Sequence, residues 1–105
     1  MNQKADLEKI LNGLGSDEAR AYAISKLVGK VDLPVSQVEK AVDIYEQAGD
    51  FYTAAKVAYE AGMMERAVEV YENAGKFDAA ARVARKAGMT ERAKQLKILV
   101  KLINQ

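Results

Sequence analysis

Glycine recurs every thirteen residues in the second half of the chain, and this spacing constrains the fold more than any other feature. The four glycines are Gly49, Gly62, Gly75 and Gly88, and each follows an alanine. Because a fixed period indicates an array of equivalent structural units, the repeat has to be interpreted before any single residue. One unit is too short to form a domain, so we expect each unit to bury its apolar face against its neighbours.

Within each thirteen-residue unit, the apolar positions have the spacing of an α-helix. Alanine occupies the first position, an aliphatic residue the fourth, and alanine the eighth, except in the last unit, which has Val100 there. These positions share one helical face, and a glycine in the left-handed conformation commonly ends a helix. Each unit is therefore predicted to be a helix of about ten residues followed by a turn.

A second period, twice as long as the first, groups these helices in pairs. Tyr45 and Tyr71 lie two units apart, and so do the segments GMMERA and GMTERA. Two consecutive units are therefore predicted to form a helical hairpin, and positions two units apart should lie side by side in a stack. The helices are expected at 35–48, 51–61, 64–74, 77–87 and about 90–103.

The segment 1–33 does not follow the repeat, but its pattern is still helical. An apolar stripe ends near Gly13, Ser16 marks a helix start, and Gly29 marks the end of that second helix. We therefore predict one continuous all-α domain of about seven short helices. It would comprise an N-terminal helical hairpin at 1–33, two tandem repeat hairpins at 34–92 and a C-terminal capping helix at 93–105.

The composition excludes several classes of function. The chain has no histidine and no cysteine, so the usual general base, the thiol nucleophile and the common transition-metal ligands are missing. It has no phosphate-binding loop and no calcium-loop pattern. We therefore expect no enzyme activity, no cofactor and no metal site.

The same features predict where the protein works. Acidic residues interrupt the first apolar stretch, which argues against a secretory signal. No apolar run is long enough to span a bilayer, and the lack of cysteine suits a reducing compartment. We therefore expect a soluble cytoplasmic protein with no membrane span.

Residues 45–61 resemble the core of a tetratricopeptide repeat. The matching residues are Tyr45, the turn Gly49-Asp50-Phe51, and the small residues Ala54, Ala58 and Ala61. The next hairpin matches with Tyr71, Gly75, Phe77, Ala80, Ala84 and Ala87, but it has Lys76 in place of the aspartate. The hairpin period is two thirteen-residue units, which is shorter than the family's period of about 34.

This shortened form is similar to helical hairpins in vesicle-coat and vesicle-fusion adaptor proteins. The resemblance covers about residues 35–92. It implies a right-handed α-α superhelix that binds another protein through the face formed by the first helix of each hairpin.

Acidic residues recur on the predicted first helices with the same spacing. The six candidates for partner binding are Glu39, Asp43, Glu46, Glu65, Glu69 and Glu72. The second three follow the first three after two units, so a stack would align them in two acidic columns. Such a surface would attract a basic protein or peptide over a distance. The competing interpretation is an ordinary solvated helix face.

Basic residues gather at the other end of the chain. Residues 1–79 carry nine Lys/Arg and fourteen Asp/Glu, whereas residues 80–105 carry seven Lys/Arg and one acid, Glu91. The basic patch comprises Arg82, Arg85, Lys86, Arg92, Lys94 and Lys97, with Lys101 further along. Nucleic-acid binding through this patch is an alternative function, but no aromatic residues alternate with the charges, which argues against it.

Self-association is a further alternative. Complementary charges at the two ends of an open stack allow head-to-tail contact between copies. In the C-terminal helix, Leu96, Leu99, Val100 and Ile103 can face the stack, while Ile98 and Leu102 point elsewhere. The helix therefore either crosses the end of the stack or carries a dimer contact. Two further tyrosines, Tyr52 and Tyr59, could present hydroxyls to a ligand, although packing is their simpler role.

From the sequence we therefore expect a non-catalytic scaffold or adaptor that binds another protein or a peptide. The residues leave the identity of the partner open.

Overall fold

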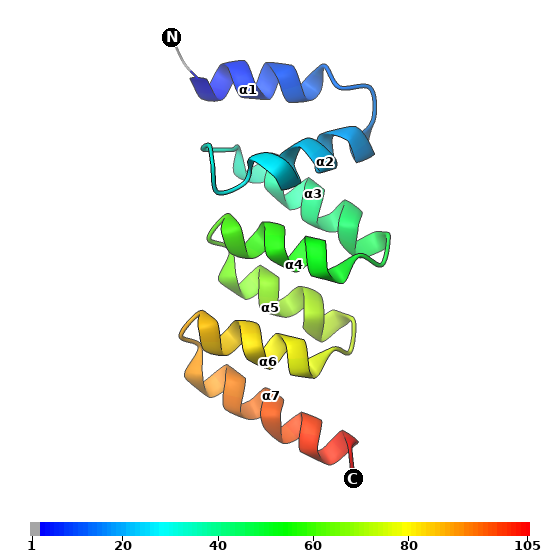
Figure 1. Ribbon diagram of the computed structural model, residues 1–105, viewed down its shortest axis with the longest axis vertical. Coiled ribbons are helices and arrows are strands. Elements are labelled where there is room, and N and C mark those ends of the chain that lie inside the picture. The colour runs from blue at the N-terminus through cyan, green and yellow to red at the C-terminus, as the bar shows by residue number, and fades with distance from the viewer. Residues whose placement is uncertain (1–2) are drawn as a thin grey trace.

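Seven α-helices follow one another in the computed structural model, which describes residues 3–105 (Figure 1). Their bounds are α1 Gln3–Asn12, α2 Asp17–Leu27, α3 Val35–Gln47, α4 Phe51–Glu60, α5 Met64–Asn73, α6 Phe77–Lys86 and α7 Thr90–Ile103. Within these described residues there is no strand, only an isolated bridge between Val28 and Val31. The predicted all-α class is confirmed. Residues 1 and 2 of the predicted N-terminal hairpin lie outside the described residues, and the division of the domain stays a prediction.

The repeat glycines end their helices in one common way. Gly49, Gly62, Gly75 and Gly88 have φ angles of 81°, 82°, 72° and 78°, in the left-handed region that side chains disfavour. In the first of these turns the N–H of Asp50 donates to the carbonyl of Tyr45 (2.9 Å), and the N–H of Gly49 donates to that of Glu46 (3.0 Å). This double hydrogen bond is the Schellman motif, which satisfies carbonyls at the helix end. The next helix begins at the second residue after each glycine, so these helices lie within a residue of their expected bounds.

Local signals also place the helix ends in the non-repeat segment. The hydroxyl of Ser16 accepts a hydrogen bond from the N–H of Ala19 (3.1 Å) and caps α2, as predicted. Gly29 follows the end of α2 with a φ of 81°. Pro34 then precedes α3 in an extended conformation and serves as its N-cap. Both boundaries therefore depend on residues within a few positions of the helix end.

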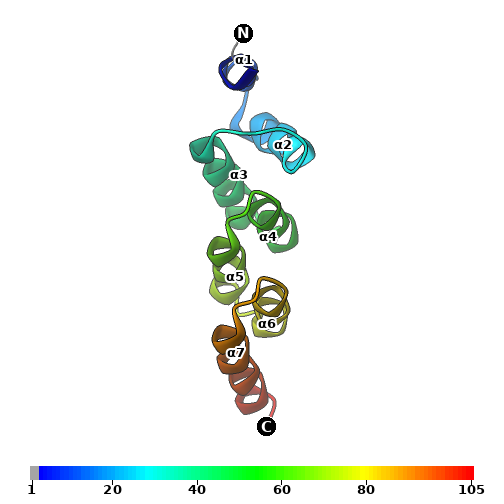
Figure 2. The same ribbon diagram turned by 90° about the vertical axis from the view of Figure 1, so that its left-hand side faces the viewer.

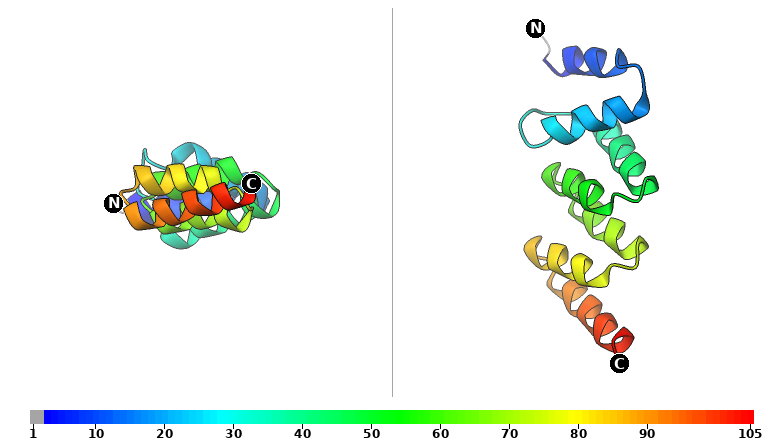
Figure 3. Two further views of the ribbon diagram at one scale, coloured as in Figure 1. Left: turned by 90° about the horizontal axis from the view of Figure 1, so that it is seen from below. Right: turned by 45° about the vertical axis from the view of Figure 1, so that its right-hand side comes forward.

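The helices alternate between two layers along an elongated stack (Figure 2). One layer contains α2, α4 and α6, the other contains α3, α5 and α7, and from α2 onward each helix packs on its neighbours in the chain. The contact between α1 and α2 is much smaller. Helices α1 and α7 lie at opposite ends of the stack (Figure 3), whose extents are 54 × 26 × 16 Å. The handedness of a superhelix stays a prediction.

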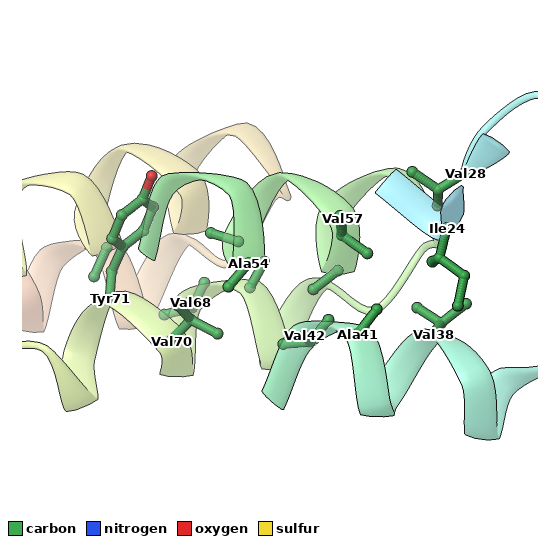
Figure 4. Packing of buried hydrophobic residues seen from close by; sticks show 14 of the residues in the cluster. Ile24, Val28, Val38, Ala41, Val42, Ala54, Val57, Val68, Val70 and Tyr71 are labelled. Atoms are coloured by element: carbon green, nitrogen blue, oxygen red, sulfur yellow. The ribbon is translucent and has the colours of Figure 1, made fainter. Parts of the chain in front are cut away.

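The buried face of each repeat differs in part from the predicted one (Figure 4). Alanines at the first position are at most 6% exposed, as expected. The eighth position was expected on the same face, but Ala48 and Ala61 are exposed. The reason is that the eighth residue is the C-cap, at the very end of the helix. The buried face instead includes residues at the second and fifth positions of the unit, such as Val68 and Tyr71.

The last helix also departs from the expectation. Leu96 is buried and Val100 is half-buried against the stack, as predicted. Leu99 and Ile103 were expected to face the stack, but they are 42% and 61% exposed. Among the helices of residues 3–105, α6 alone has an extensive contact with α7, so one side of α7 is exposed.

Candidate functional site

The acidic residues of α3 and α5 surround one arginine. Nη2 of Arg66, on α5, donates to Oδ1 of Asp43 (2.8 Å) and to Oε1 of Glu46 (2.6 Å) on α3. Its Nη1 donates to Oε1 of Glu69 (3.3 Å) on α5 itself. Since α3 and α5 belong to different hairpins of the chain, Arg66 joins two successive hairpins.

The same contact recurs one hairpin further along. Nε and Nη2 of Arg92, on α7, donate to the two carboxylate oxygens of Glu72 on α5, at 2.7 and 2.5 Å. Arg92 lies two thirteen-residue units after Arg66, and Glu72 lies two units after Glu46. The two arginines with their carboxylates therefore form a ladder along the α3–α5–α7 layer. We refer to the surface of α3 and α5 that carries the six predicted acidic residues as the acidic face.

Arg66 has no role in the sequence prediction, and Arg92 is predicted there only as part of the basic patch. Both were visible in the repeated segments GMMERA and GMTERA, where a basic residue keeps its place from one hairpin to the next. This pattern indicates a period but does not indicate that the arginines pair with the glutamates of the preceding hairpin. Such pairing depends on how far apart α3, α5 and α7 lie, which the sequence does not give.

Burial divides the carboxylates into two groups. The side chains of Glu46 and Glu72 are both 19% exposed and are held by the arginines. Those of Asp43 and Glu69 are 57% and 55% exposed. Glu39 and Glu65 are also at the surface, and within the described part of the chain neither forms an ion pair. The six carboxylates share this surface with three cations, Arg66, Arg92 and Lys40, of which Lys40 occupies the position on α3 equivalent to Arg66, so an excess of three negative charges remains.

The carboxylates raise the pKa of both arginines. Burial alone would lower the pKa of Arg66, but its hydrogen bonds with Glu46 and Asp43 outweigh that effect and raise the pKa. The hydrogen bond with Glu72 raises the pKa of Arg92, and Glu65 adds to this from a greater distance. The guanidinium groups are ionised at any pH near neutrality, and the hydrogen bonds of the ladder stabilise that charged form further.

The predicted basic patch is divided among several places. Arg92 belongs to the ladder, and Lys94 lies 3.6 Å from Glu91 in an exposed ion pair. Arg82, Arg85 and Lys97 line an open groove of about 310 Å³ between α6 and α7. Lys86 lies apart from them, in a groove between α4 and α6. The structure thus brings only three of the six predicted basic residues together.

The described residues contain neither a metal-ligand cluster nor a membrane-spanning helix. Nowhere between residues 3 and 105 do three acidic, histidine or cysteine side chains gather as a metal site would require. In the same range, no helix has the length and apolar character needed to cross a bilayer.

Comparison with known proteins adds no identification. No protein-family model, no curated protein and no solved structure matches this chain. The likeness to tetratricopeptide repeats therefore rests on the residues quoted for it and stays a prediction.

Proposed function

We propose that the protein is a non-catalytic interaction module that binds a basic segment of another protein through the acidic face of α3 and α5. The observation that carries this proposal is the set of exposed carboxylates beside the ladder. Asp43, Glu69, Glu39 and Glu65 project from two neighbouring helices and leave negative charge that the arginines do not neutralise.

The ladder supports this proposal because it positions the carboxylates before a partner arrives. Arg66 holds α3 against α5, so the exposed acids on both helices keep their spacing. A basic helix or extended peptide lying across the two helices could then contact both columns at once. Complementary charge of this kind contributes mainly to the association rate and to the choice of partner.

The cellular setting belongs to the same proposal. A chain without cysteine suits a reducing compartment, so we place the module in the cytoplasm. The right-handed superhelix and the adaptor role implied by the tetratricopeptide resemblance are also part of what we propose.

The test uses charge reversal at the two acids of this face that form no ion pair with any described residue. Glu39→Lys and Glu65→Lys change equivalent positions on α3 and α5 and leave the ladder intact. The probe is a fluorescein-labelled, lysine-rich helical peptide, followed by fluorescence anisotropy at several salt concentrations. We expect the double variant to bind about tenfold more weakly, and binding by the wild type to weaken as salt screens the charges.

A matched control separates the acidic face from the overall charge. Glu18→Lys with Asp78→Lys makes the same change of charge at exposed positions on α2 and α6. We expect this control to bind like the wild type. Equal loss in both double variants, or no loss in the first, would contradict the proposed site.

Self-association is the second candidate, and it is favoured by the uncovered side of α7. Ile98 and Leu102 are 57% and 59% exposed, beside the exposed Leu99 and Ile103. Apolar side chains clustered on one surface often mark an interface. Light scattering across protein concentration would reveal an oligomer, and Ile98→Lys with Leu102→Lys should abolish it.

A further inference from the structure

A groove between α4 and α6 is lined by aromatic side chains on the layer opposite the acidic face. Its volume is about 320 Å³, and its walls include Tyr52, Tyr59, Tyr71 and Val83, with Ala55 between them. Tyr71 extends from α5 toward the groove, its hydroxyl pointing away from the core (Figure 4). Tyr71 is buried at 8% exposure, so the core packs against this wall of the groove.

The tyrosines of α4 exceed what the repeat needs for packing. Helix α6 is equivalent to α4 and has the same length and the same buried alanines, yet it carries Asp78 where α4 has Tyr52. It likewise carries Arg85 where α4 has Tyr59. A helix of this array therefore folds without aromatic residues at these positions.

Tyr52 in particular buries little of its side chain against the rest of the protein. Its side chain is 67% exposed, so most of a large ring lies in water. Tyrosine is enriched at the centres of protein interfaces, where its ring buries apolar area and its hydroxyl remains available for a hydrogen bond. An exposed tyrosine that the repeat does not require fits that role better than a packing role.

Three charged side chains line the groove, Lys56, Glu60 and Lys86, while Arg82 and Asp50 act on Tyr71 from nearby. Lys56 lies 3.3 Å from Glu60 in an ion pair one turn apart on α4. Lys86 lies on the α6 side and forms no ion pair with any other residue that the structure describes. A ligand that carries an anionic group beside an aromatic or aliphatic side chain would therefore match this groove. The anionic group could pair with Lys86, and the apolar side chain could contact the tyrosines.

We propose that this groove binds an acidic peptide segment of a partner protein, with one aromatic or large aliphatic side chain inserted between Tyr52 and Tyr59 and a neighbouring carboxylate on Lys86. A peptide fits better than a small molecule, because small-molecule sites enclose most of the ligand and this groove is an open trough between two helices. The site is independent of the acidic face, which lies on the other layer and selects the opposite charge.

The experiment exploits the absence of tryptophan from the chain. The probe is a capped peptide with glutamates on both sides of a central tryptophan, so all tryptophan emission comes from the peptide. We expect a saturable blue shift as the full chain is added, with half-saturation below about 1 mM. The same peptide with lysines in place of the glutamates should bind at least about tenfold more weakly.

The variants substitute residues that α6 already carries. Tyr52→Asp with Tyr59→Arg should leave the helix content unchanged by circular dichroism and weaken binding at least about tenfold. Lys86→Gln should weaken binding of the glutamate peptide and reduce its dependence on salt. The control is Tyr22→Ala on α2, which removes a tyrosine that is 60% exposed and outside the groove, and it should bind like the wild type.

Several outcomes would overturn the proposal. These are the absence of a saturable shift, undiminished binding by the tyrosine variant, and loss of binding in Tyr22→Ala to the same extent. Equally tight binding of indole acetate would assign the groove to a small molecule. If the groove variants instead changed the oligomeric state and the peptide did not bind, the occupant would be a second copy of the chain.

Discussion

The two arginines of the ladder are a controlled comparison that the repeat itself provides. They occupy equivalent positions on α5 and α7, but the side chain of Arg66 is 21% exposed and that of Arg92 is 44% exposed. Arg66 contacts three carboxylates, whereas Arg92 contacts one. We therefore expect Arg66→Gln to destabilise the protein more than Arg92→Gln.

The magnitudes follow from burial and geometry. Hydrogen bonds to charged groups contribute about 1.5–3 kcal/mol, whereas exposed ion pairs contribute about 0.2–1 kcal/mol. Arg66 and Glu46 are both mostly buried, so we place Arg66→Gln near the lower end of the first range, at about 1.5 kcal/mol. Arg92 is more exposed but donates two hydrogen bonds to Glu72. We therefore expect Arg92→Gln to lower the free energy of unfolding by about 0.5–1 kcal/mol.

Urea unfolding followed by far-ultraviolet circular dichroism measures both losses. A double-mutant cycle with Glu46→Gln isolates the interaction between Arg66 and Glu46, for which we expect about 1 kcal/mol. At about 1 M salt, where charges are screened within about 3 Å, the loss in Arg92→Gln should shrink more than the loss in Arg66→Gln. If Arg92→Gln costs as much as Arg66→Gln, or if the cycle gives no coupling, the argument from burial is wrong.

Two further predictions concern a helix end and the core. Gly62→Ala should cost about 1 kcal/mol from the φ of 82° alone, because the added methyl would meet open space. Gly15→Ala, which also meets open space and has no positive φ, should be neutral or slightly stabilising in the same thermal melts. Burial raises the pKa of Tyr71 above 10.0, so folding favours its neutral form. This contribution to stability is present below the unfolded pKa and is lost as the pH rises through the folded one. Tyr71→Phe should therefore lose less stability than the wild type between about pH 9 and pH 11, and equal losses would contradict the assignment.

The helices could be predicted closely because their ends depend on nearby residues. Each repeat glycine closes a turn whose hydrogen bonds join near neighbours in the chain, as from Asp50 to Tyr45. Ser16 likewise caps α2 through the nearby N–H of Ala19. The error at the eighth position has a local cause too, since that alanine is the C-cap and not a residue of the packed face.

The candidate site was predicted less completely. The period of two thirteen-residue units places Glu46 and Glu72 at equivalent sequence positions, and in the structure each forms an ion pair with an arginine, Arg66 and Arg92 respectively. It did not indicate that Arg66 on α5 would pair with Glu46, or that Arg92 on α7 would pair with Glu72. It also did not distinguish these glutamates from Glu39 and Glu65, which carry the same formal charge but form no ion pair within the described residues.

The order of glycines, alanines and aliphatic residues was by itself enough to predict the helices of the repeat and their bounds, because backbone conformation at a helix end responds to side chains a few positions away. The tertiary structure decided which charges meet across helices, which side of α7 stays uncovered and where Tyr52, Tyr59 and Tyr71 converge. These features depend on the spacing and orientation of helices distant in the chain, and a small shift of one helix against another would have separated the same residues.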